Sequence, residues 1–326
     1  MRRALIVGID HYPVGRLTSC VNDANAVKQY LDKNEDGTPN FDCQLMISHA
    51  DYQKKESLEI TRYRLKRKIH QLFSNEAQVA LLYFSGHGGQ NDFGGYLITQ
   101  DAVQFDEGVS INEILLMANR SKVKEIIIIL DCCYSGSFGN DPMAEGKLTM
   151  LREGVSILTS SSDYQTSKGR NGRGVFTELI CEALEGEAAD ILGRVDVASI
   201  YQYADQVLDS WEQRPVFKTH ATTMVSVRNC QPRVHLEILR KLADYFSGED
   251  DKLKLSEEHL IGDEPSVPAK ELEFSHLQMY LSAGLITLSD EDYQGRQMSE
   301  AAQEGKECEL TKLGEYYWKL AKNGRL

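Results

Sequence analysis

Two segments of the sequence end a run of apolar residues in a side chain that can do chemistry. His87 follows the apolar run 78–84, and Cys133 follows the apolar run 125–130. Such runs predict buried strands of a parallel sheet, and reactive groups gather outside the carboxyl ends of these strands. We therefore interpret His87 as a general base and Cys133 as the thiol nucleophile of one site. Either residue alone would be explained more simply, as a histidine at a strand end or as a small buried cysteine.

The residues around His87 suit acyl transfer. A thiol attacks as the thiolate, and a nearby imidazole lowers the pKa of the thiol and later protonates the leaving amine. Gly86 and Gly88 flank His87 and permit tight turns and the close approach of a substrate. We expect the backbone N–H groups of Gly88 and Cys133 to donate to the developing oxyanion, because acyl transfer needs such a pair of donors.

Strand and helix patterns alternate along the first part of the chain, up to about residue 228. This alternation predicts right-handed βαβ units and an α/β fold with a mostly parallel sheet flanked by helices. Ser110 followed by Glu113 predicts a capping box at the start of a helix that runs to about Asn119. The predicted strands are 3–9, 44–48, 78–84, 125–130, 155–159 and one within 215–227, and the other predicted helices are 21–31, 56–73, 175–184 and 195–208. The apolar stripe of the helix at 56–73 consists of Leu58, Tyr63, Leu65, Ile69 and Leu72.

The pattern changes near Cys230, so we predict two domains, at 1–229 and 230–326. The second domain shows a helix at 234–246, a helix at 272–283 that ends in Gly284 and passes into a strand, a polar hairpin and a closing helix. This order resembles a winged helix-turn-helix module. Residues 231–326 contain 12 Lys and Arg against 19 Asp and Glu, and the segment expected to enter a DNA groove, 271–283, contains no Lys or Arg. Because phosphate contacts need positive charge, the composition favours a protein-interaction role over DNA binding.

The composition excludes several classes of protein. The net charge of −13 disfavours non-specific binding to nucleic acids or anionic membranes. Seven cysteines without a C-x-x-C pair indicate neither a disulfide framework nor a zinc site. The sequence contains no apolar run long enough to span a membrane, and the apolar run that starts at Ala4 is too short for a secretory signal. We therefore expect a cytoplasmic protein without a metal or other cofactor.

Several ordered motifs make the chain resemble the caspase-like cysteine peptidases, and most closely their metacaspase and prokaryotic orthocaspase branch. The resemblance covers roughly residues 1–228 and does not extend into the C-terminal region. The matching motifs are Arg3-Ala4-Leu5-Ile6-Val7-Gly8-Ile9, Cys20-Val21-Asn22-Asp23-Ala24, Tyr83-Phe84-Ser85-Gly86-His87-Gly88, Asp131-Cys132-Cys133-Tyr134-Ser135-Gly136, Ser162-Asp163-Tyr164-Gln165-Thr166-Ser167 and Gly174-Val175-Phe176-Thr177.

The resemblance implies a catalytic dyad of His87 and Cys133. The family pattern Asp-x-Cys-x-Ser-Gly assigns the nucleophile to Cys133 and makes Cys132 the variable position. Tyr134 departs from the family, where the residue after the nucleophile is commonly His. The resemblance also implies a substrate pocket formed by Asp23 and Asp131 with Cys20 and Ser85 beside them.

Two buried carboxylates in this pocket would favour a substrate with Arg or Lys on the amino side of the cleaved bond, the P1 position, and would disfavour Asp there. The competing explanation for Asp23 is a charge that complements the dipole at the start of a helix. Basic residues at Lys147, Arg152, Lys168, Arg170 and Arg173 are candidate self-cleavage sites, although most exposed basic loop residues are merely solvated. Calcium activates part of the family, but the chain contains no D-x-D-x-D-G loop from which ligands could be assigned.

The sequence therefore predicts an endopeptidase that cleaves protein substrates after Arg or Lys. The resemblance to prokaryotic relatives suggests a bacterial stress or antiviral defence pathway, with residues 230–326 binding a protein regulator. The alternatives are a catalytically silent scaffold of the same fold and a transcription regulator that acts through the winged-helix module. The charge of residues 231–326 disfavours the last of these.

Overall fold

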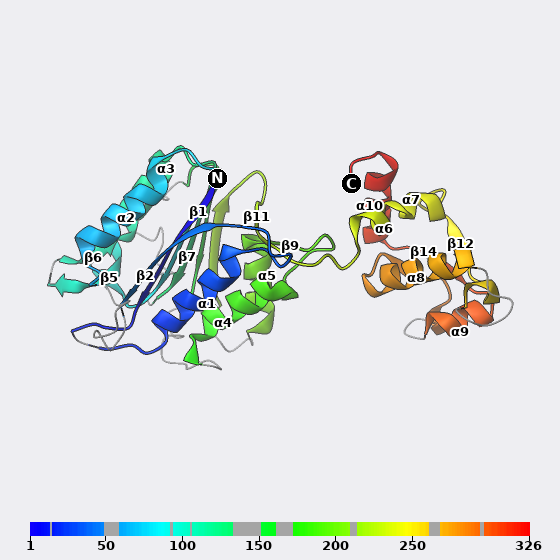
Figure 1. Cartoon of the computed structure of the whole chain (residues 1–326), viewed down its shortest axis with the longest axis horizontal. Helices are drawn as coiled ribbons and strands as arrows, with labels where there is room; N and C mark the ends of the chain where they lie inside the picture. The colour runs from blue at the N-terminus through cyan, green and yellow to red at the C-terminus, as the bar shows by residue number, and fades with distance from the viewer. Residues whose placement is uncertain are drawn as a thin grey trace. The chain divides into compact units, whose positions relative to one another are not determined.

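The structure is a computed structural model, and the chain forms two compact units (Figure 1). Unit 1 comprises Met1–Ala189 and Arg194–Cys230, and unit 2 comprises Asp190–Gly193 and Gln231–Leu326. The structure describes residues 1–13, 15–48, 59–91, 94–104, 106–132, 151–160, 172–208, 214–260, 268–293 and 297–326.

Unit 1 is built on a sheet whose order, within the described residues, is β10-β8-β7-β3-β1-β2. Its neighbouring strands are parallel except for β10, which runs antiparallel to β8 at one edge. The strands are β1 (Arg2–Ile9), β2 (Asp42–Ser48), β3 (Val79–Ser85), β7 (Glu125–Asp131), β8 (Val155–Thr159) and β10 (Val216–His220). Strands β3 and β7 lie between other strands and are buried along nearly their whole length, which explains their unbroken apolar sequences. The predicted α/β fold with a mostly parallel sheet is confirmed.

Helices cover both faces of this sheet (Figure 1). Helices α2 (Arg62–Ser74) and α3 (Ile111–Arg120) share one apolar cluster with Leu5, Leu82 and Ile128. Helices α1 (Cys20–Asp32), α4 (Val175–Glu182) and α5 (Val197–Val207) pack on the other face. A π-helical turn, η4 (Ala183–Glu187), extends α4, and β9 (Arg194–Asp196) pairs with β11 (Ser226–Asn229). Because successive side chains of a strand point to opposite faces, the sheet contributes to one apolar core on each side.

Three predictions for the α2–α3 face are wrong. Helix α2 begins at Arg62 rather than at residue 56, because Thr61 caps it and Ile60 instead bonds to Gln100 through its N–H and its carbonyl. Tyr63 is 70% exposed and does not belong to the apolar stripe. Ser110 makes no side-chain capping bond, and Glu113 instead forms ion pairs with Arg62 and Lys66 of α2.

A small antiparallel sheet follows β3 and carries the residues around His87. Its order is β4-β5-β6, with β4 (Gly88–Asn91), β5 (Gly94–Val103) and β6 (Asp106–Ser110). Gly88 pairs with Leu97, and the carbonyl of His87 accepts a hydrogen bond of 3.0 Å from the N–H of Ile98. The chain therefore leaves the large sheet at Ser85 and enters the small sheet at Gly88, and His87 lies between the two.

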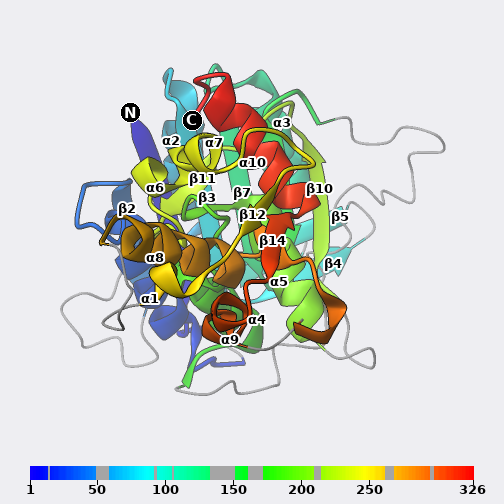
Figure 2. The same cartoon turned by 90° about the vertical axis from the view of Figure 1, so that its right-hand side faces the viewer.

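Unit 2 combines short helices with an antiparallel sheet whose order is β12-β14-β13 within the described residues. Figure 2 shows β12 and β14 side by side. Its elements are α6 (Leu236–Arg240), α7 (Leu242–Tyr245), β12 (Lys252–Lys254), η5 (Glu257–His259), α8 (Pro268–Ser282), β13 (Ile286–Leu288), η6 (Glu291–Tyr293), α9 (Met298–Gln303), β14 (Glu307–Leu310) and α10 (Lys312–Lys322).

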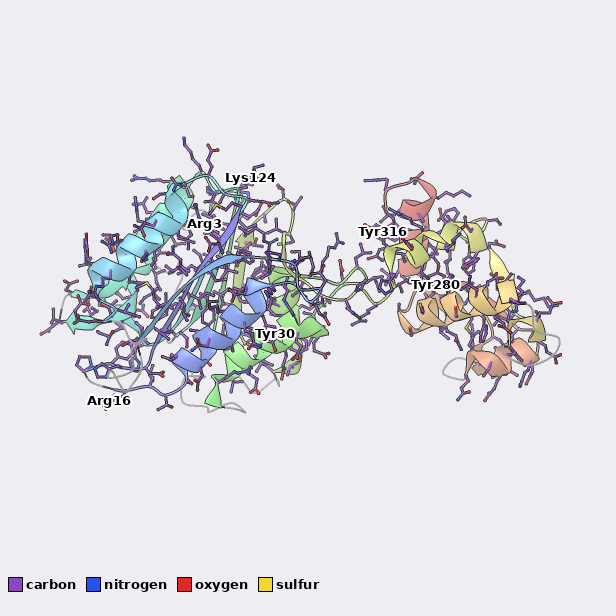
Figure 3. All side chains as sticks on the ribbon, in the orientation of Figure 1. Arg3, Arg16, Tyr30, Lys124, Tyr280 and Tyr316 are labelled. Atoms are coloured by element: carbon purple, nitrogen blue, oxygen red, sulfur yellow. The ribbon has the colours of Figure 1, made fainter. Side chains whose placement is uncertain are left out.

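The core of unit 2 is mainly aliphatic but contains aromatic residues with buried polar tips. Tyr280, labelled on α8 in Figure 3, is fully buried and donates a hydrogen bond to the carbonyl of Ile238. The indole of Trp318 donates to the carbonyl of Phe246 at 2.7 Å. Buried aromatic residues with polar tips need such partners, so these bonds fix how α8 and α10 pack. Leu272 of α8 is 58% exposed and lies outside this core.

No helix among the described residues is both long and apolar enough to span a membrane.

Candidate active site

The register of the parallel strands brings the predicted site residues to one edge of the sheet. Gly8 of β1 lies beside Ser85 of β3, and Ser85 lies beside Asp131 of β7. His87 follows Ser85 by two residues, and Cys133 follows Asp131 by two residues. Cys133 lies outside the described residues. The described residues nonetheless contain most of the predicted site.

The imidazole of His87 is oriented by the main chain. Its Nε2 lies at hydrogen-bond distance from the carbonyl oxygen of Gly15. Because a carbonyl can only accept, Nε2 must carry the proton of this bond. In the neutral ring Nδ1 then holds the lone pair, which is the form that can take a proton from a thiol. Gly15 has φ of +73°, and a Cβ there would begin 3.2 Å from Nε2, so both the backbone and the close approach favour glycine.

Tyr12 contacts His87 through both its hydroxyl and its ring. Its hydroxyl accepts a hydrogen bond of 3.0 Å from the backbone N–H of His87 and donates to the carbonyl of Ile98 at 3.3 Å. The two rings are in contact, with centroids 4.6 Å apart. Tyr12 is buried, and this burial raises the pKa of its hydroxyl well above the usual value. The hydroxyl therefore stays neutral and links the end of β3 to β5.

Asp23 lies in the first turn of α1, next to the carboxyl end of β3. Its side chain is fully buried. Its Oδ1 accepts from the N–H of Gly174 at 2.9 Å, and its Oδ2 accepts from the hydroxyl of Ser85 at 3.0 Å. Burial and then the repulsion from Asp131 raise the pKa of Asp23 to about 7. Asp23 thus lies in the first turn of α1, as the competing explanation requires, and is also a buried carboxylate close to a second one.

Asp131 ends β7 and is also buried. Its Oδ2 accepts a hydrogen bond of 2.6 Å from the hydroxyl of Thr177 on α4, and that hydroxyl is 2.5 Å from the hydroxyl of Tyr83. Burial raises the pKa of Asp131, against the opposing effect of the bonds from Thr177 and Ser160. A Cβ built on Gly174 would lie 3.1 Å from Oδ2 of Asp131 and 3.5 Å from Oδ2 of Asp23. The two carboxylates therefore converge on the backbone of Gly174.

Helix α1 is seated tightly against β1, which brings Asp23 to this position. A Cβ on Gly8 would begin 2.3 Å from the carbonyl oxygen of Cys20, so only glycine permits the approach. Asp10, at the end of β1, accepts from the N–H of Cys20 at 2.8 Å and anchors the start of the helix. The thiol of Cys20 is buried beside Ser85, and burial raises its pKa well above the usual value. Cys20 therefore places a neutral thiol beside Ser85 and near the two carboxylates.

The structure thus brings together four predicted pocket residues, Cys20, Asp23, Ser85 and Asp131. It also adds groups that sequence reasoning missed. The Gly15 carbonyl and the Gly174 N–H belong to the main chain, which carries no signal of residue type. Thr177 stands in the motif Gly174-Val175-Phe176-Thr177 that carried part of the resemblance, so its place in the motif was a usable signal. The assignment of Gly88 as an oxyanion donor stays a prediction.

Of the two adjacent cysteines, the structure describes only Cys132. Cys132 is fully buried within the apolar cluster beneath α2 and α3. Among the candidate self-cleavage residues, Arg152 donates to the carbonyls of Ala118 and Val123 and so anchors the end of α3. Lys147, Lys168 and Arg170 lie outside the described residues.

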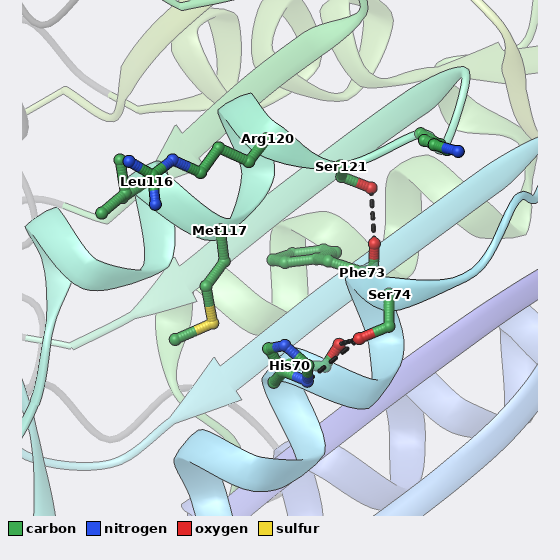
Figure 4. Close-up of a pocket in the computed structure, with 8 residues that line it drawn as sticks. His70, Phe73, Ser74, Leu116, Met117, Arg120 and Ser121 are labelled. Carbon is green, nitrogen blue, oxygen red and sulfur yellow. Dashed lines mark hydrogen bonds between the residues drawn. The ribbon is translucent and has the colours of Figure 1, made fainter.

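A separate groove of about 460 Å³ lies between the C-terminal ends of α2 and α3 (Figure 4). Arg3, near the start of β1, donates to the carbonyl of Leu72 at the end of α2, so this groove lies at the amino ends of the strands. His87 lies past the opposite, carboxyl ends. The residues that line the groove are His70, Phe73, Ser74, Leu116, Met117, Arg120, Ser121 and Lys122, and no predicted site residue is among them.

The part of the chain that the structure describes holds no cluster of His, Cys, Asp and Glu suited to a metal ion.

Comparisons with known proteins bear on the family. Among solved structures, the chain is similar to caspase-1 from Spodoptera frugiperda, with a TM-score of 0.47 and 15% sequence identity over 72% of this chain and 91% of that chain. No curated protein matches the chain. The family model described as Caspase domain matches residues 1–226, which is more than half of the chain. The chain therefore belongs to the Caspase domain family, has its fold in unit 1 and is of the cysteine-peptidase kind.

Proposed function

We propose that the protein is a cysteine endopeptidase in which His87 and Cys133 form the catalytic dyad. The observation that carries this proposal is the contact between His87 Nε2 and the Gly15 carbonyl, because it leaves Nδ1 as the basic nitrogen. Complete burial of Cys132 supports Cys133 as the thiol that meets the substrate.

In the proposed mechanism, Nδ1 of His87 takes the proton of the Cys133 thiol. The thiolate attacks the carbonyl carbon of the peptide bond, and the oxyanion that forms accepts hydrogen bonds from backbone N–H groups, with Gly88 as the expected donor. His87 then gives its proton to the leaving amine as the carbon–nitrogen bond breaks. A water molecule, deprotonated by His87, hydrolyses the thioester and restores the thiol.

We further propose that the enzyme selects Arg or Lys at P1. Asp23 and Asp131 are buried near each other; burial raises the pKa of both, and repulsion from Asp131 adds to the rise at Asp23. A guanidinium or ammonium group would relieve that repulsion, whereas an Asp side chain would add a third carboxylate. This arrangement is the reverse of a pocket suited to acidic residues.

The test is cleavage of matched reporter peptides that differ only at P1, with Arg, Lys or Asp. We expect turnover with Arg and Lys, none with Asp, and none from Cys133→Ala. Labelling of Cys133 by an arginyl ketone would exclude the alternative of a catalytically silent scaffold. A wild-type protein that neither cleaves the Arg reporter nor reacts with the ketone would contradict the proposed function.

We propose that unit 2 is a winged-helix module that binds a protein regulator. The order of its elements supports this, because α8 is followed by β13 and β14, and β12 pairs with β14 at the centre of the sheet. Helix α8 begins with Glu271 among its first residues and offers a DNA phosphate little positive charge. An electrophoretic shift with random duplex DNA should show no binding by the full chain. A cytoplasmic role in bacterial stress or antiviral defence rests on the resemblance alone.

A further inference from the structure

The first turn of α4 donates hydrogen bonds to both carboxylates of the pocket. The N–H of Gly174, the residue just before the helix, donates to Asp23, and the hydroxyl of Thr177 donates to Asp131. Val175–Glu182 form the helix, so its positive dipole end faces the two carboxylates. The amino end of α4 thus supplies one hydrogen-bond donor to each of the two carboxylates.

These donors are neutral, so they leave the negative charge of the carboxylates available to a cationic substrate. Besides burial and other carboxylates, the groups that shift the pKa of Asp23 and Asp131 are hydroxyls and backbone N–H groups. A neutral donor stabilises the ionised carboxylate without cancelling its charge. A lysine or arginine in the same place would bind the carboxylate equally well but would leave nothing for a cationic substrate to neutralise.

The bond between Thr177 and Tyr83 has a defined direction. An ionised Asp131 can only accept, so the hydroxyl hydrogen of Thr177 points to Asp131 and the oxygen of Thr177 must accept from Tyr83. All three side chains are buried. A chain of bonds in one direction strengthens each member in a medium of low dielectric constant. Tyr83 therefore supports the donor on which Asp131 depends.

We infer that Thr177 is a specificity-determining residue, which keeps Asp131 ionised and aimed at a cationic P1 side chain, and that Tyr83 is the positioning residue behind it. This inference rests on the proposed function, since it assigns a role within the proposed P1 pocket. Neither residue takes part in the chemistry at Cys133. Their loss should therefore change selection among substrates more than turnover of a neutral one.

The test compares two reporter peptides in the full-length protein, one with Arg at P1 and one with citrulline, its neutral isostere. The variants are Thr177→Val, which removes the hydroxyl and keeps the shape, Thr177→Ser, which keeps the hydroxyl, and Tyr83→Phe. Tyr203→Phe is the matched control, because its hydroxyl bonds to Glu182 on the far end of α4. For each variant kcat and KM are measured from pH 5 to pH 9.

For Thr177→Val we expect about a tenfold fall in the Arg-to-citrulline ratio of kcat/KM at pH 7, most of it as a higher KM for the Arg peptide. Losing the bond raises the pKa of Asp131 further, so the acid limb of the Arg profile should move to higher pH. Thr177→Ser should restore the ratio, Tyr83→Phe should give a smaller shift of the same sign, and Tyr203→Phe should match wild type.

A wild-type ratio and acid limb in Thr177→Val would overturn the inference. So would equal losses on both peptides in Tyr83→Phe, because damage to the fold does not distinguish Arg from citrulline. If Thr177→Val does not fold, Tyr83→Phe against Thr177→Ser decides by the same ratio. A wild-type enzyme that cleaves the Arg peptide while these variants match it leaves the proposed function intact, whereas absence of wild-type cleavage overturns both.

Discussion

The two halves of the site are held in different ways. His87 is half-buried; its imidazole contacts the backbone carbonyl of Gly15, and its own backbone N–H donates to the side-chain hydroxyl of Tyr12. Asp23 and Asp131 are buried, and side-chain hydroxyls from Ser85 and Thr177 share in holding them. The imidazole of His87 is thus held through a main-chain atom, whereas each carboxylate also depends on a neighbouring side-chain hydroxyl that a substitution would remove. The comparison suggests that selectivity in this protein can vary while the chemistry is kept.

We expect the largest effect from removing the imidazole of His87, which belongs to the part of the site that carries out the chemistry. His87→Ala should lower kcat/KM by at least about a thousandfold, because the thiol loses its base and the leaving amine loses its acid. The loss should be the same on Arg and citrulline reporters. A loss confined to the Arg reporter would mean that His87 contributes to selection, against the division proposed here.

Removing the charge of Asp131 should have a smaller effect, which should differ between the Arg and the citrulline reporter. Asp131→Asn keeps the shape and an acceptor for Thr177 but removes the charge, so kcat/KM for the Arg reporter should fall about a hundredfold. Turnover of the citrulline reporter should stay within about threefold of wild type. Steady-state kinetics on both reporters measures the split, and equal losses would show that Asp131 supports the catalytic geometry instead.

The two halves should also respond differently to pH. The pKa of Asp23 is raised to about 7, so its charge grows as pH rises from 6 to 8. We expect kcat/KM of the Arg reporter to rise about tenfold over this range relative to the citrulline reporter. Taking the ratio cancels the titration of the dyad, which both reporters share. A flat ratio in wild type would refute the role of Asp23 in the pocket.

The smallest effect concerns stability and has a counterintuitive sign. Protonation of Asp23 is easier in the folded protein, with a pKa of about 7, than in the unfolded chain, where it is near 3.8. The folded state therefore binds more protons between about pH 4 and pH 7, and its stability falls as pH rises through that window. Asp23→Asn should raise Tm by a few degrees at pH 8 and should change little at pH 4. A lower Tm at pH 8, measured by calorimetry, would mean that the hydrogen bonds of Asp23 outweigh its buried charge.

The sequence predicted those elements of unit 1 well whose position is set by a run of apolar residues. The strands at β3 and β7 are confirmed within a residue or two, because burial on both faces leaves an unbroken apolar run. Prediction failed where tertiary contacts outweighed local pattern. Tyr63 fits a helical stripe but is exposed, and Glu113 fits a capping box but pairs with Lys66 instead.

The site followed the same rule. Asp23, Ser85 and His87 carry their chemistry in their side chains, so motifs and the resemblance identified them. The carbonyl of Gly15 and the N–H of Gly174 act through atoms that every residue possesses, and only the fold reveals them. Tyr83 reads as an apolar strand residue, and its hydroxyl acquires a meaning only once Thr177 lies against it.

The chain passes between the two units at 189/190, 193/194 and 230/231. Ile191 therefore belongs to the apolar core of unit 2 together with Val234 and Phe246, although unit 1 residues precede and follow its short segment. A single proteolytic cut after Cys230 would sever the covalent link but would leave Ile191 on the amino-terminal fragment. A fragment that starts at residue 231 would lack Ile191 and would leave an unfilled apolar site in its core. Unit 2 is thus not a removable tail, because a cut at residue 231 leaves the segment Asp190–Gly193 of unit 2 behind.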